Sequence, residues 1–190
     1  MTSAARVLVP LAEGFEEVEA VTIIDLLRRA EIEVVTAGLQ SRRVTGNHGI
    51  TLEADTTLDA ALAAAAPAFD MIALPGGLPG ARHLQSDARL IAALQAAIAQ
   101  GACAAAICAA PIALAAAGLL EGRRATSFPG FLDAAVIPGL ELSEAPVVRD
   151  GQVITSRGPG TAMDFALALI EQLAGSEVRE RVEVRLQRPG

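Results

Sequence analysis

Short apolar runs alternate along the chain with segments in which apolar residues recur at helical spacing. Strands are expected at residues 6–11, 33–39, 42–45, 50–54, 70–74, 102–107, 146–149 and 152–156. Helices are expected at residues 16–30, 59–65, 109–117 and 161–174, and between Ser86 and Gly101. Strands that are apolar throughout and alternate with helices are typical of a parallel sheet covered on both faces. We therefore predict an α/β fold, a flavodoxin-like doubly wound sandwich with a mostly parallel sheet and helices on both faces, formed by one domain over residues 1–190.

Local patterns mark the ends of several elements. Residues 46–49 and Asp150-Gly151 are turn sequences typical of β-hairpins. Ser86 is placed to cap the helix that follows it. Thr161 and Asp164 resemble a capping box at the start of the last predicted helix. Ligands of open α/β sheets bind beyond the carboxyl ends of the strands, so the strand-to-helix junctions are the first places to look for chemistry.

The first predicted helix is apolar on more than one face. A helix on the surface of a monomer needs only a single apolar stripe. The surplus predicts a second buried contact, most simply in a two-fold homodimer, although deeper burial within one chain would also account for it. The apolar residues concerned are Val18, Ala20, Val21, Ile23, Ile24, Leu26 and Leu27.

The composition removes several classes of function. The chain has 190 residues, a formal net charge of −7 and no Trp or Tyr, which makes it a poor candidate for binding nucleic acid. All 15 basic residues are Arg, which excludes a lysine Schiff base. The two Cys and two His lack the spacing of a zinc finger or zinc ribbon, so we predict no metal and no other cofactor.

Three observations bear on where the protein works. Two Cys do not make a disulfide framework, which favours a reducing compartment. The first residues lack the apolar stretch of a signal peptide. Residues 90–120 carry no charge, but Gln, Gly and Pro interrupt them, as in buried helices and strands rather than a membrane span. We therefore expect a cytoplasmic protein with no membrane partner.

Cys108 is the strongest candidate for chemistry. It stands between a strand that ends at Ile107 and the helix that follows, with the small residues Ala106 and Ala110 two positions to either side. A nucleophile elbow requires small residues there, because the backbone folds back sharply. Amides at the start of the following helix would favour a thiolate, whereas the alternative is an inert buried cysteine. For Cys103, in the middle of an apolar strand, core packing is the simpler interpretation.

Three other junctions carry candidate groups. Gly76 and Gly77 follow a strand, where their amides form either an anion-binding concavity or an ordinary turn. Arg157 follows the last strand. It could contact an anion or a carbonyl group there, or it could be an ordinary solvated side chain of a turn. Glu19 lies beside apolar residues of the first helix, where desolvation would raise its pKa and let it share a proton with a thiolate. Acids commonly collect at helix starts, so spacing alone does not single out Glu19 from its acidic neighbours.

Four stretches of the sequence together resemble the ThiJ/PfpI superfamily, in the branch of the parkinsonism-associated protein deglycase and its bacterial relatives. They are AEGFEEVEA, ALPGG, AAICAAP and TSRGPGTAMDFALALIEQL, in this order over nearly the whole chain. The resemblance implies a flavodoxin-like homodimer with a redox-sensitive cysteine at Cys108, whose sulfur is hydrogen-bonded by Glu19. It also implies backbone N–H groups from Gly76 and Gly77, with Arg157 nearby.

The sequence departs from this pattern in two places. Many members of the superfamily have a histidine near the elbow cysteine, where this chain has Phe128, so Glu19 would handle protons alone or with water. The protease-like branch has a histidine directly after the cysteine, where this chain has Ala109, which disfavours peptidase activity. His48 and His83 are expected at the surface, although a turn histidine such as His48 could approach a site across a dimer.

Two functions follow from these residues. The first is a cofactor-independent cysteine enzyme for small reactive aldehydes, which the resemblance implies as glyoxalase III-type conversion of methylglyoxal to lactate or as deglycation, in carbonyl and oxidative stress. Cys108 would attack the aldehyde, Glu19 would move a proton between adjacent carbons, and the amides of Gly77 and Ala109 would hold the oxyanion. The second is a non-enzymatic redox sensor or redox-regulated chaperone, in which Cys108 is oxidised to a sulfinate.

Overall fold

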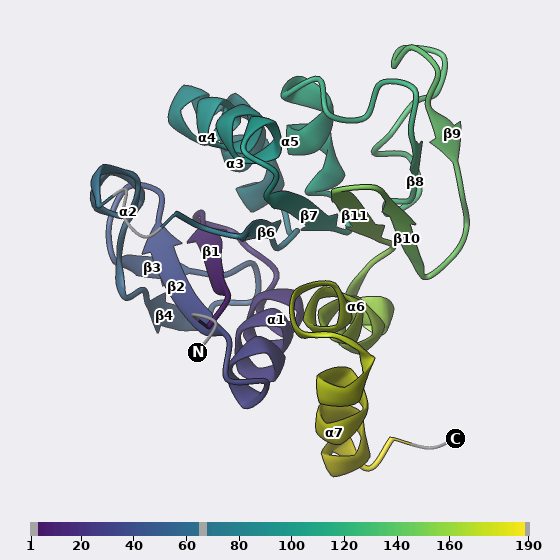
Figure 1. The fold of residues 1–190 in the computed structure, drawn as a ribbon. Helices are drawn as coiled ribbons and strands as arrows, with labels where there is room; N and C mark the ends of the chain where they lie inside the picture. Colours follow the sequence, from purple (N-terminus) through teal and green to yellow (C-terminus); the bar gives the residue numbers. More distant parts are fainter. Residues whose placement is uncertain (1–3, 65–67, 189–190) are drawn as a thin grey trace.

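A seven-stranded sheet with the order β10-β11-β7-β6-β1-β2-β5 forms the centre of the computed structural model, which describes residues 4–64 and 68–188 (Figure 1). Neighbouring strands pair in parallel, except for the antiparallel β10–β11 hairpin. The predicted mostly parallel sheet is therefore confirmed. Its strands are β1 (Arg6–Leu11), β2 (Glu33–Gly38), β5 (Thr56–Thr57), β6 (Met71–Leu74), β7 (Cys103–Ile107), β10 (Val147–Asp150) and β11 (Val153–Ser156).

Helices cover both faces of this sheet, as predicted. Figure 1 shows α3, α4 and α5 on one face and α1, α6 and α7 on the other. Each face has its own cluster of buried apolar residues, because the central strands β6 and β7 are apolar and buried along their whole length. The helices are α1 (Glu17–Arg29), α2 (Leu58–Ala63), α3 (Gly80–Ser86), α4 (Ala88–Ala99), α5 (Pro111–Ala116), α6 (Ala162–Ala174) and α7 (Ser176–Leu186).

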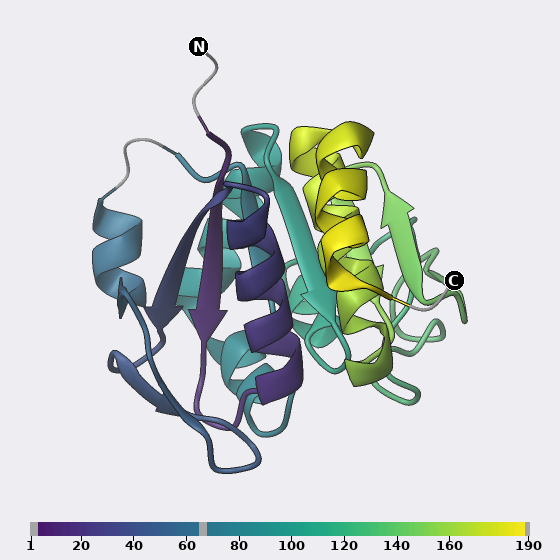
Figure 2. The ribbon, with the colours of Figure 1, turned by 90° about the horizontal axis from the view of Figure 1, so that it is seen from below.

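The parallel strands bring the loops that follow β1, β6 and β7 to one edge of the sheet. After β1 the chain forms β2 on one side of it, whereas β6 and β7 lie on the other side. The crevice where the strand order reverses is the usual ligand site of such sheets. The hairpin of β3 (Arg43–Thr45) and β4 (Thr51–Glu53) lies at the same edge, toward which the arrowheads of β1 and β2 point in Figure 2.

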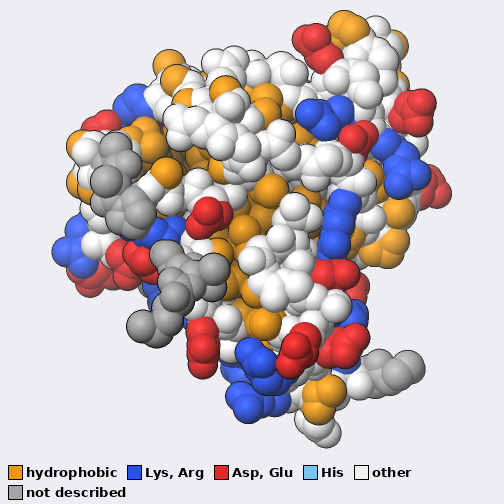
Figure 3. Space-filling view, in the orientation of Figure 1, with side chains coloured by type: hydrophobic (Ala, Val, Ile, Leu, Met, Phe, Trp, Pro, Cys, Tyr) orange, Lys and Arg blue, Asp and Glu red, His pale blue; other side chains and the backbone are white. Residues whose placement is uncertain are grey.

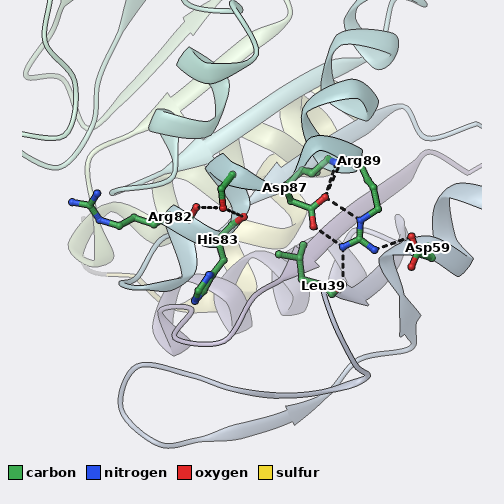
Figure 4. A network of polar contacts seen from close by, with 8 residues as sticks. Leu39, Asp59, Arg82, His83, Asp87 and Arg89 are labelled. Atoms are coloured by element: carbon green, nitrogen blue, oxygen red, sulfur yellow. Dashed lines mark hydrogen bonds and ion pairs between the residues drawn. The ribbon is translucent and has the colours of Figure 1, made fainter.

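The segment after β6 differs from the prediction, because it contains two helices rather than one. α3 ends at Ser86, and Asp87 is the residue that caps α4. The Asp87 carboxylate accepts hydrogen bonds from the N–H groups of Arg89 at 3.0 Å and Leu90 at 3.2 Å (Figure 4). The Ser86 hydroxyl instead donates to the carbonyl of Arg82 at 2.9 Å, so the prediction of Ser86 as the cap is wrong.

Arg89 connects the start of α4 to two other elements. Its guanidinium pairs with Asp87 and with Asp59 of α2, the latter at 2.8 Å, and donates to the carbonyl of Leu39 after β2 at 3.0 Å (Figure 4). These contacts fix α2 and α4 against the same edge of the sheet. The predicted end of α2 at Ala65 lies outside the described residues.

The predicted capping box at the start of α6 is also wrong. Thr161 precedes α6, but its side chain makes no capping hydrogen bond to it. Its hydroxyl accepts from the N–H of Gly158 at 3.1 Å and lies 2.7 Å from the hydroxyl of Ser156. Asp164 pairs with Arg188 at 2.6 Å. The 3-10 turn before α6 therefore uses the hydroxyl that the capping box would require.

Several polar or short elements were not predicted, namely β5, β8 (Arg124–Ala125), β9 (Glu141–Leu142) and α7. α7 contacts the core chiefly through Val182 and carries charges of both signs, including the pair Arg179–Glu183 at 2.8 Å. On the face drawn in Figure 3, acidic and basic side chains are interspersed rather than gathered into a basic patch. Among the described residues, no helix is both long and apolar enough to cross a membrane.

Candidate functional site

Cys108 occupies a sharply bent backbone position between β7 and α5. Its φ angle is 63°, in the left-handed region that residues other than glycine seldom adopt, at a cost of about 1–3 kcal/mol. Two hydrogen bonds of 2.9 Å hold this conformation, from the Cys108 N–H to the carbonyl of Ser156 and from the Phe128 N–H to the Cys108 carbonyl. Ala106 and Ala110 are fully buried beside the bend. The backbone thus has the geometry that an elbow requires.

Glu19 lies in the first turn of α1, fully buried against Cys108. Its Oε2 accepts a 2.8 Å hydrogen bond from the N–H of Gly76, in the loop after β6. Its Oε1 is buried and, among the described residues, has no partner with good hydrogen-bond geometry. A Cβ atom on Gly76 would lie 2.7 Å from both the Cys108 Cβ and Glu19 Oε2. Glycine at this position therefore permits the approach of the carboxyl group to the cysteine.

The pKa of the Glu19 carboxyl is raised to about 7. Burial is the main cause, and the negative charge of Glu16 adds to it, whereas hydrogen bonds from Gly76 and Cys108 oppose it. At neutral pH the carboxyl group is consequently protonated for much of the time. This is the direction that desolvation on the apolar part of the first helix predicted.

The pKa of the Cys108 thiol is raised to about 12, first by burial and then by the charge and the acceptor oxygen of Glu19. The amides of Ala109 and Gly77 oppose this shift. The prediction of a lowered thiol pKa is thus wrong while Glu19 is ionised, because burial and the carboxylate outweigh the amides at the helix start. α5 has only six residues and begins at Pro111, so its dipole is a small effect beside burial and an adjacent carboxylate.

The thiol and the carboxyl group titrate as a pair. Protonation of Glu19 removes the negative charge that disfavours the thiolate and turns its buried, unpartnered oxygen into a donor. The sulfur of Cys108 then accepts hydrogen bonds from the Glu19 carboxyl group and from the amides of Gly77 and Ala109. The other oxygen of the carboxyl group accepts from the amide of Gly76. The two side chains can therefore share one proton. The chemistry of this pair depends on the raised pKa of Glu19.

The two glycines after β6 were predicted to form one anion-binding concavity, but their amides bond to different groups. The N–H of Gly76 is bonded to Glu19, so it is not free to bind an oxyanion. The N–H of Gly77 faces the sulfur of Cys108, as does that of Ala109. Gly77 has a φ of 93°, and a Cβ atom there would lie 2.3 Å from the Glu16 nitrogen. Only glycine fits at this position without displacing the start of α1.

Arg157 and Phe128 lie on the side of the site formed by the chain after β11 and β8. The ring of Phe128 packs over Gly158, edge-on to Phe131 with 6.1 Å between ring centroids, and is 45% exposed. Arg157 lines a neighbouring hollow of about 290 Å³ that Cys108 does not line, so its role as a substrate contact stays a prediction. The other lining residues are Ser127, Pro129, Gly130, Leu132, Leu142, Ser143 and Glu144.

A second group of polar side chains beside the site was missed by the sequence analysis. His48, in the β3–β4 turn, places Nδ1 3.1 Å from Glu17 Oε2 and 3.5 Å from Glu16 Oε1. The hydrogen bond to Glu17 and the charge of Glu16 raise the pKa of His48. The His48 side chain is largely exposed, as predicted. Nothing in the spacing of the sequence indicates that this turn meets the start of α1.

The model of the DJ-1/PfpI family matches residues 5–172 of the chain. The chain belongs to the DJ-1/PfpI family. The resemblance to the ThiJ/PfpI superfamily is thereby confirmed. Protein DJ-1 homolog A of Arabidopsis thaliana is 41% identical over 198 residues, which cover 96% of this chain but only 47% of the relative. The chain thus spans about half the length of that plant protein.

Relatives of similar length support the same assignment. The Parkinson disease protein 7 homolog of Danio rerio is 40% identical over 183 residues, which cover 95% of this chain and 96% of the relative. A protein of Pyrococcus abyssi named as a deglycase is 34% identical over 155 residues, which cover 82% and 91%. The crystal structure of Drosophila melanogaster DJ-1beta has a TM-score of 0.91 and 36% identity, covering 99% of this chain and all of that one. The flavodoxin-like fold of this DJ-1/PfpI chain is therefore confirmed.

Proposed function

We propose that this chain is a cofactor-independent cysteine enzyme that acts on small reactive aldehydes, by glyoxalase III-type conversion of methylglyoxal to lactate or by deglycation. The observation that carries the proposal is the contact between Cys108, at a strained elbow, and the buried carboxyl group of Glu19 with its pKa near 7. A nucleophile and a group able to carry a proton at neutral pH thus share one site. The name of the Pyrococcus abyssi deglycase, a relative of nearly equal length, supports the same chemistry.

The reaction needs no external oxidant. The Cys108 thiolate adds to the aldehyde carbon of methylglyoxal, and the resulting oxyanion takes up a proton to give a hemithioacetal. Glu19 removes the hydrogen of that carbon as a proton and returns a proton to the neighbouring carbon, which converts the hemithioacetal into a lactoyl thioester. Water then cleaves the thioester and releases lactate and the thiol. We expect the amides of Gly77 and Ala109, which face the sulfur, to stabilise the oxyanions.

Lactate formation from methylglyoxal by the purified protein tests this proposal. We expect turnover that is lost in Cys108→Ala and falls about 100-fold or more in Glu19→Gln, since general acid–base groups contribute factors of this size. Cys103→Ala is the matched control and should retain activity, because Cys103 lies at the other end of β7. A wild-type protein that forms no lactate, or equal losses in both cysteine variants, would contradict the proposal.

Deglycation needs a separate arm of this experiment, because removal of free methylglyoxal imitates it. A thiol or amine adduct is formed first, and free methylglyoxal is then removed before the protein is added. Release of lactate from the adduct alone at a rate that depends on Cys108 indicates deglycation. Lactate only when free methylglyoxal is present indicates the glyoxalase reaction.

A redox sensor is the second candidate, favoured by Phe128 at the place where the family resemblance implies a histidine beside the elbow cysteine. Cys108 would be oxidised by two equivalents of peroxide, with the formation of a sulfinic acid and two molecules of water. Mass spectrometry after mild oxidation should then find two added oxygen atoms on Cys108 and none on Cys103. This result in a protein without lactate formation would select the sensor.

We also propose a cytoplasmic two-fold homodimer. The cytoplasmic part of this proposal rests on the sequence, because two cysteines do not make a disulfide framework and so favour a reducing compartment. Val18 and Val21 of α1 and Ile50 of the β3–β4 hairpin are about half exposed, at 55%, 46% and 56%. Val18 and Val21 are the apolar residues of α1 that the single chain leaves most exposed. Ile50 is an exposed apolar residue of the neighbouring hairpin. A second copy of the chain would cover them.

A further inference from the structure

His48, Glu16 and Glu17 converge from two separate elements. The two glutamates begin α1, and the histidine lies in the turn of the β3–β4 hairpin. One atom from each, the Nδ1 of His48 and one carboxylate oxygen of each glutamate, lies within 4.8 Å of the other two. We propose that these three side chains bind a divalent transition-metal ion, and that Zn²⁺ fits them best. This site is separate from the carbonyl chemistry proposed for Cys108.

The two distances from His48 to the carboxylate oxygens match zinc coordination, and the two oxygens lie within 4.8 Å of each other. Zinc bonds to imidazole nitrogen and carboxylate oxygen measure about 2.0–2.1 Å, so the donors of a tetrahedral site are about 3.4 Å apart. His48 Nδ1 lies 3.1 Å from Glu17 Oε2 and 3.5 Å from Glu16 Oε1. Three protein ligands leave a fourth position, which water can occupy in the single chain because the His48 side chain is largely exposed there.

Glu17 is held in place for this role. It is only 4% exposed, and its Oε1 accepts hydrogen bonds from the N–H groups of His48 at 2.7 Å and Ile50 at 3.2 Å. The hairpin backbone closes over it, since a Cβ atom on Gly46 would lie 2.4 Å from Oε1. Oε2 lies 3.1 Å from His48 Nδ1. Hydrogen bonds of this kind orient the ligands of known metal sites.

The charge at this cluster supports a cation independently of the distances. The two carboxylates are mostly buried, and no arginine forms an ion pair with either of them among the described residues. Every basic residue of the chain is an arginine, so no lysine can take this place. With His48 neutral, the cluster carries two carboxylate charges that no cationic side chain among the described residues pairs with. A divalent ion would balance both of them, whereas an exposed histidine balances at most one.

Calorimetric titration with Zn²⁺ tests the proposal in full-length Cys108→Ser protein, because this change removes the thiol beside Glu19 as a competing ligand. We expect one ion per chain and a melting temperature that rises with Zn²⁺, because the ion binds the folded state. His48→Ala and Glu16→Gln, added separately, should weaken binding about tenfold or more through loss of a ligand. His83→Ala is the matched control and should bind like the parent protein.

Glu16→Gln keeps the test independent of folding, because the Glu16 side chain, unlike that of Glu17, makes no hydrogen bond to the hairpin backbone. The melting temperature without metal checks that both variants are folded. Absence of saturable binding, binding that survives loss of either ligand, or binding that His83→Ala removes would each overturn the proposal. His48 would then be only an ion-pair partner that fastens the hairpin to α1. None of these outcomes bears on lactate formation at Cys108.

Discussion

Glu19 makes the stability of the folded chain depend on pH. Burial raises its pKa from 4.5 to about 7, so the folded protein holds this proton more tightly than the unfolded chain does. The contribution is fully present below about pH 4.5 and is lost as the pH rises through about 7. We therefore expect the free energy of unfolding of the wild type to fall relative to that of Glu19→Gln across this range, by a few kcal/mol at most. Urea denaturation of both proteins at several pH values measures the difference, and a constant difference would contradict the shift.

Gly76 is the residue whose lack of a side chain allows the thiol and the carboxyl group to meet. In Gly76→Ala the new methyl group would lie 2.7 Å from both partners, so one of them must move. We expect a loss of stability of about 2 kcal/mol and a lower reactivity of Cys108. Gly160→Ala is the matched control, since no atom lies within 4 Å of its Cβ position and the change should stay within about 0.5 kcal/mol. Thermal unfolding compares the two, and equal effects would contradict this role of Gly76.

At the scale of residues, the sequence predicted positions better than roles. The small neighbours of Cys108 were enough to predict the elbow, because that constraint is local. The pKa of the thiol was predicted in the wrong direction, because it depends on Glu19, which only the folded chain brings beside it. The bond from Gly76 to Glu19 was missed for the same reason. Two other glutamates have nearly the same spacing as Glu19, and only the packing of α1 decides which one is buried against the sulfur.

At the scale of elements, the start of α4 depends on Asp87. The Arg89 guanidinium lowers the pKa of Asp87, as do the amides that the carboxylate caps, so its contribution is present above about pH 4 and is lost as the pH falls through the lowered value. We expect Asp87→Ala to cost about 1–2 kcal/mol at neutral pH, as loss of a cap does. Ser86→Ala should cost no more than about 0.5 kcal/mol. Urea denaturation distinguishes them, and a larger loss for Ser86→Ala would restore the cap that the sequence suggested.

The strands were predicted within one or two residues, whereas the errors concern short or polar elements. Apolar runs such as β7 are read directly from the sequence, because the two faces of a parallel sheet are both buried. The break between α3 and α4 was missed because Ser86 and Asp87 are both good caps, and the position of Arg89 decides between them. α7 has too little apolar character to be predicted, since it contacts the core chiefly through Val182.

At the scale of the whole molecule, the exposed apolar residues of α1 predict association. Val18→Asp would place a charge in the centre of the proposed dimer surface, so we expect it to yield monomers. Val136→Asp is the matched control, because Val136 is 75% exposed in a loop far along the chain from α1. Sedimentation equilibrium measures the mass of each protein. A monomeric wild type, or dissociation by Val136→Asp alone, would contradict the proposed dimer surface.

The topology brings the candidate groups together, and this much was predictable. An α/β sandwich with parallel strands places the loops after β1, β6 and β7 at one edge, which is why junction residues were the right ones to examine. The approach of the β3–β4 turn to α1 was not predictable, because it depends on buried contacts of Glu17 rather than on periodicity. The prediction of no metal considered only Cys and His as ligands, so it could not include a cluster with two carboxylates.

The rate of Cys108 alkylation as a function of pH tests most directly whether the thiol and Glu19 share a proton. The shared proton predicts a half-maximal rate near pH 7, the pKa of Glu19, and below the value of about 8.5 for an ordinary thiol. This step should vanish in Glu19→Gln. Cys103, whose thiol pKa is raised by burial, should react slowly throughout. A rate at Cys108 that rises only above about pH 8.5, or that equals the rate at Cys103, would contradict the account.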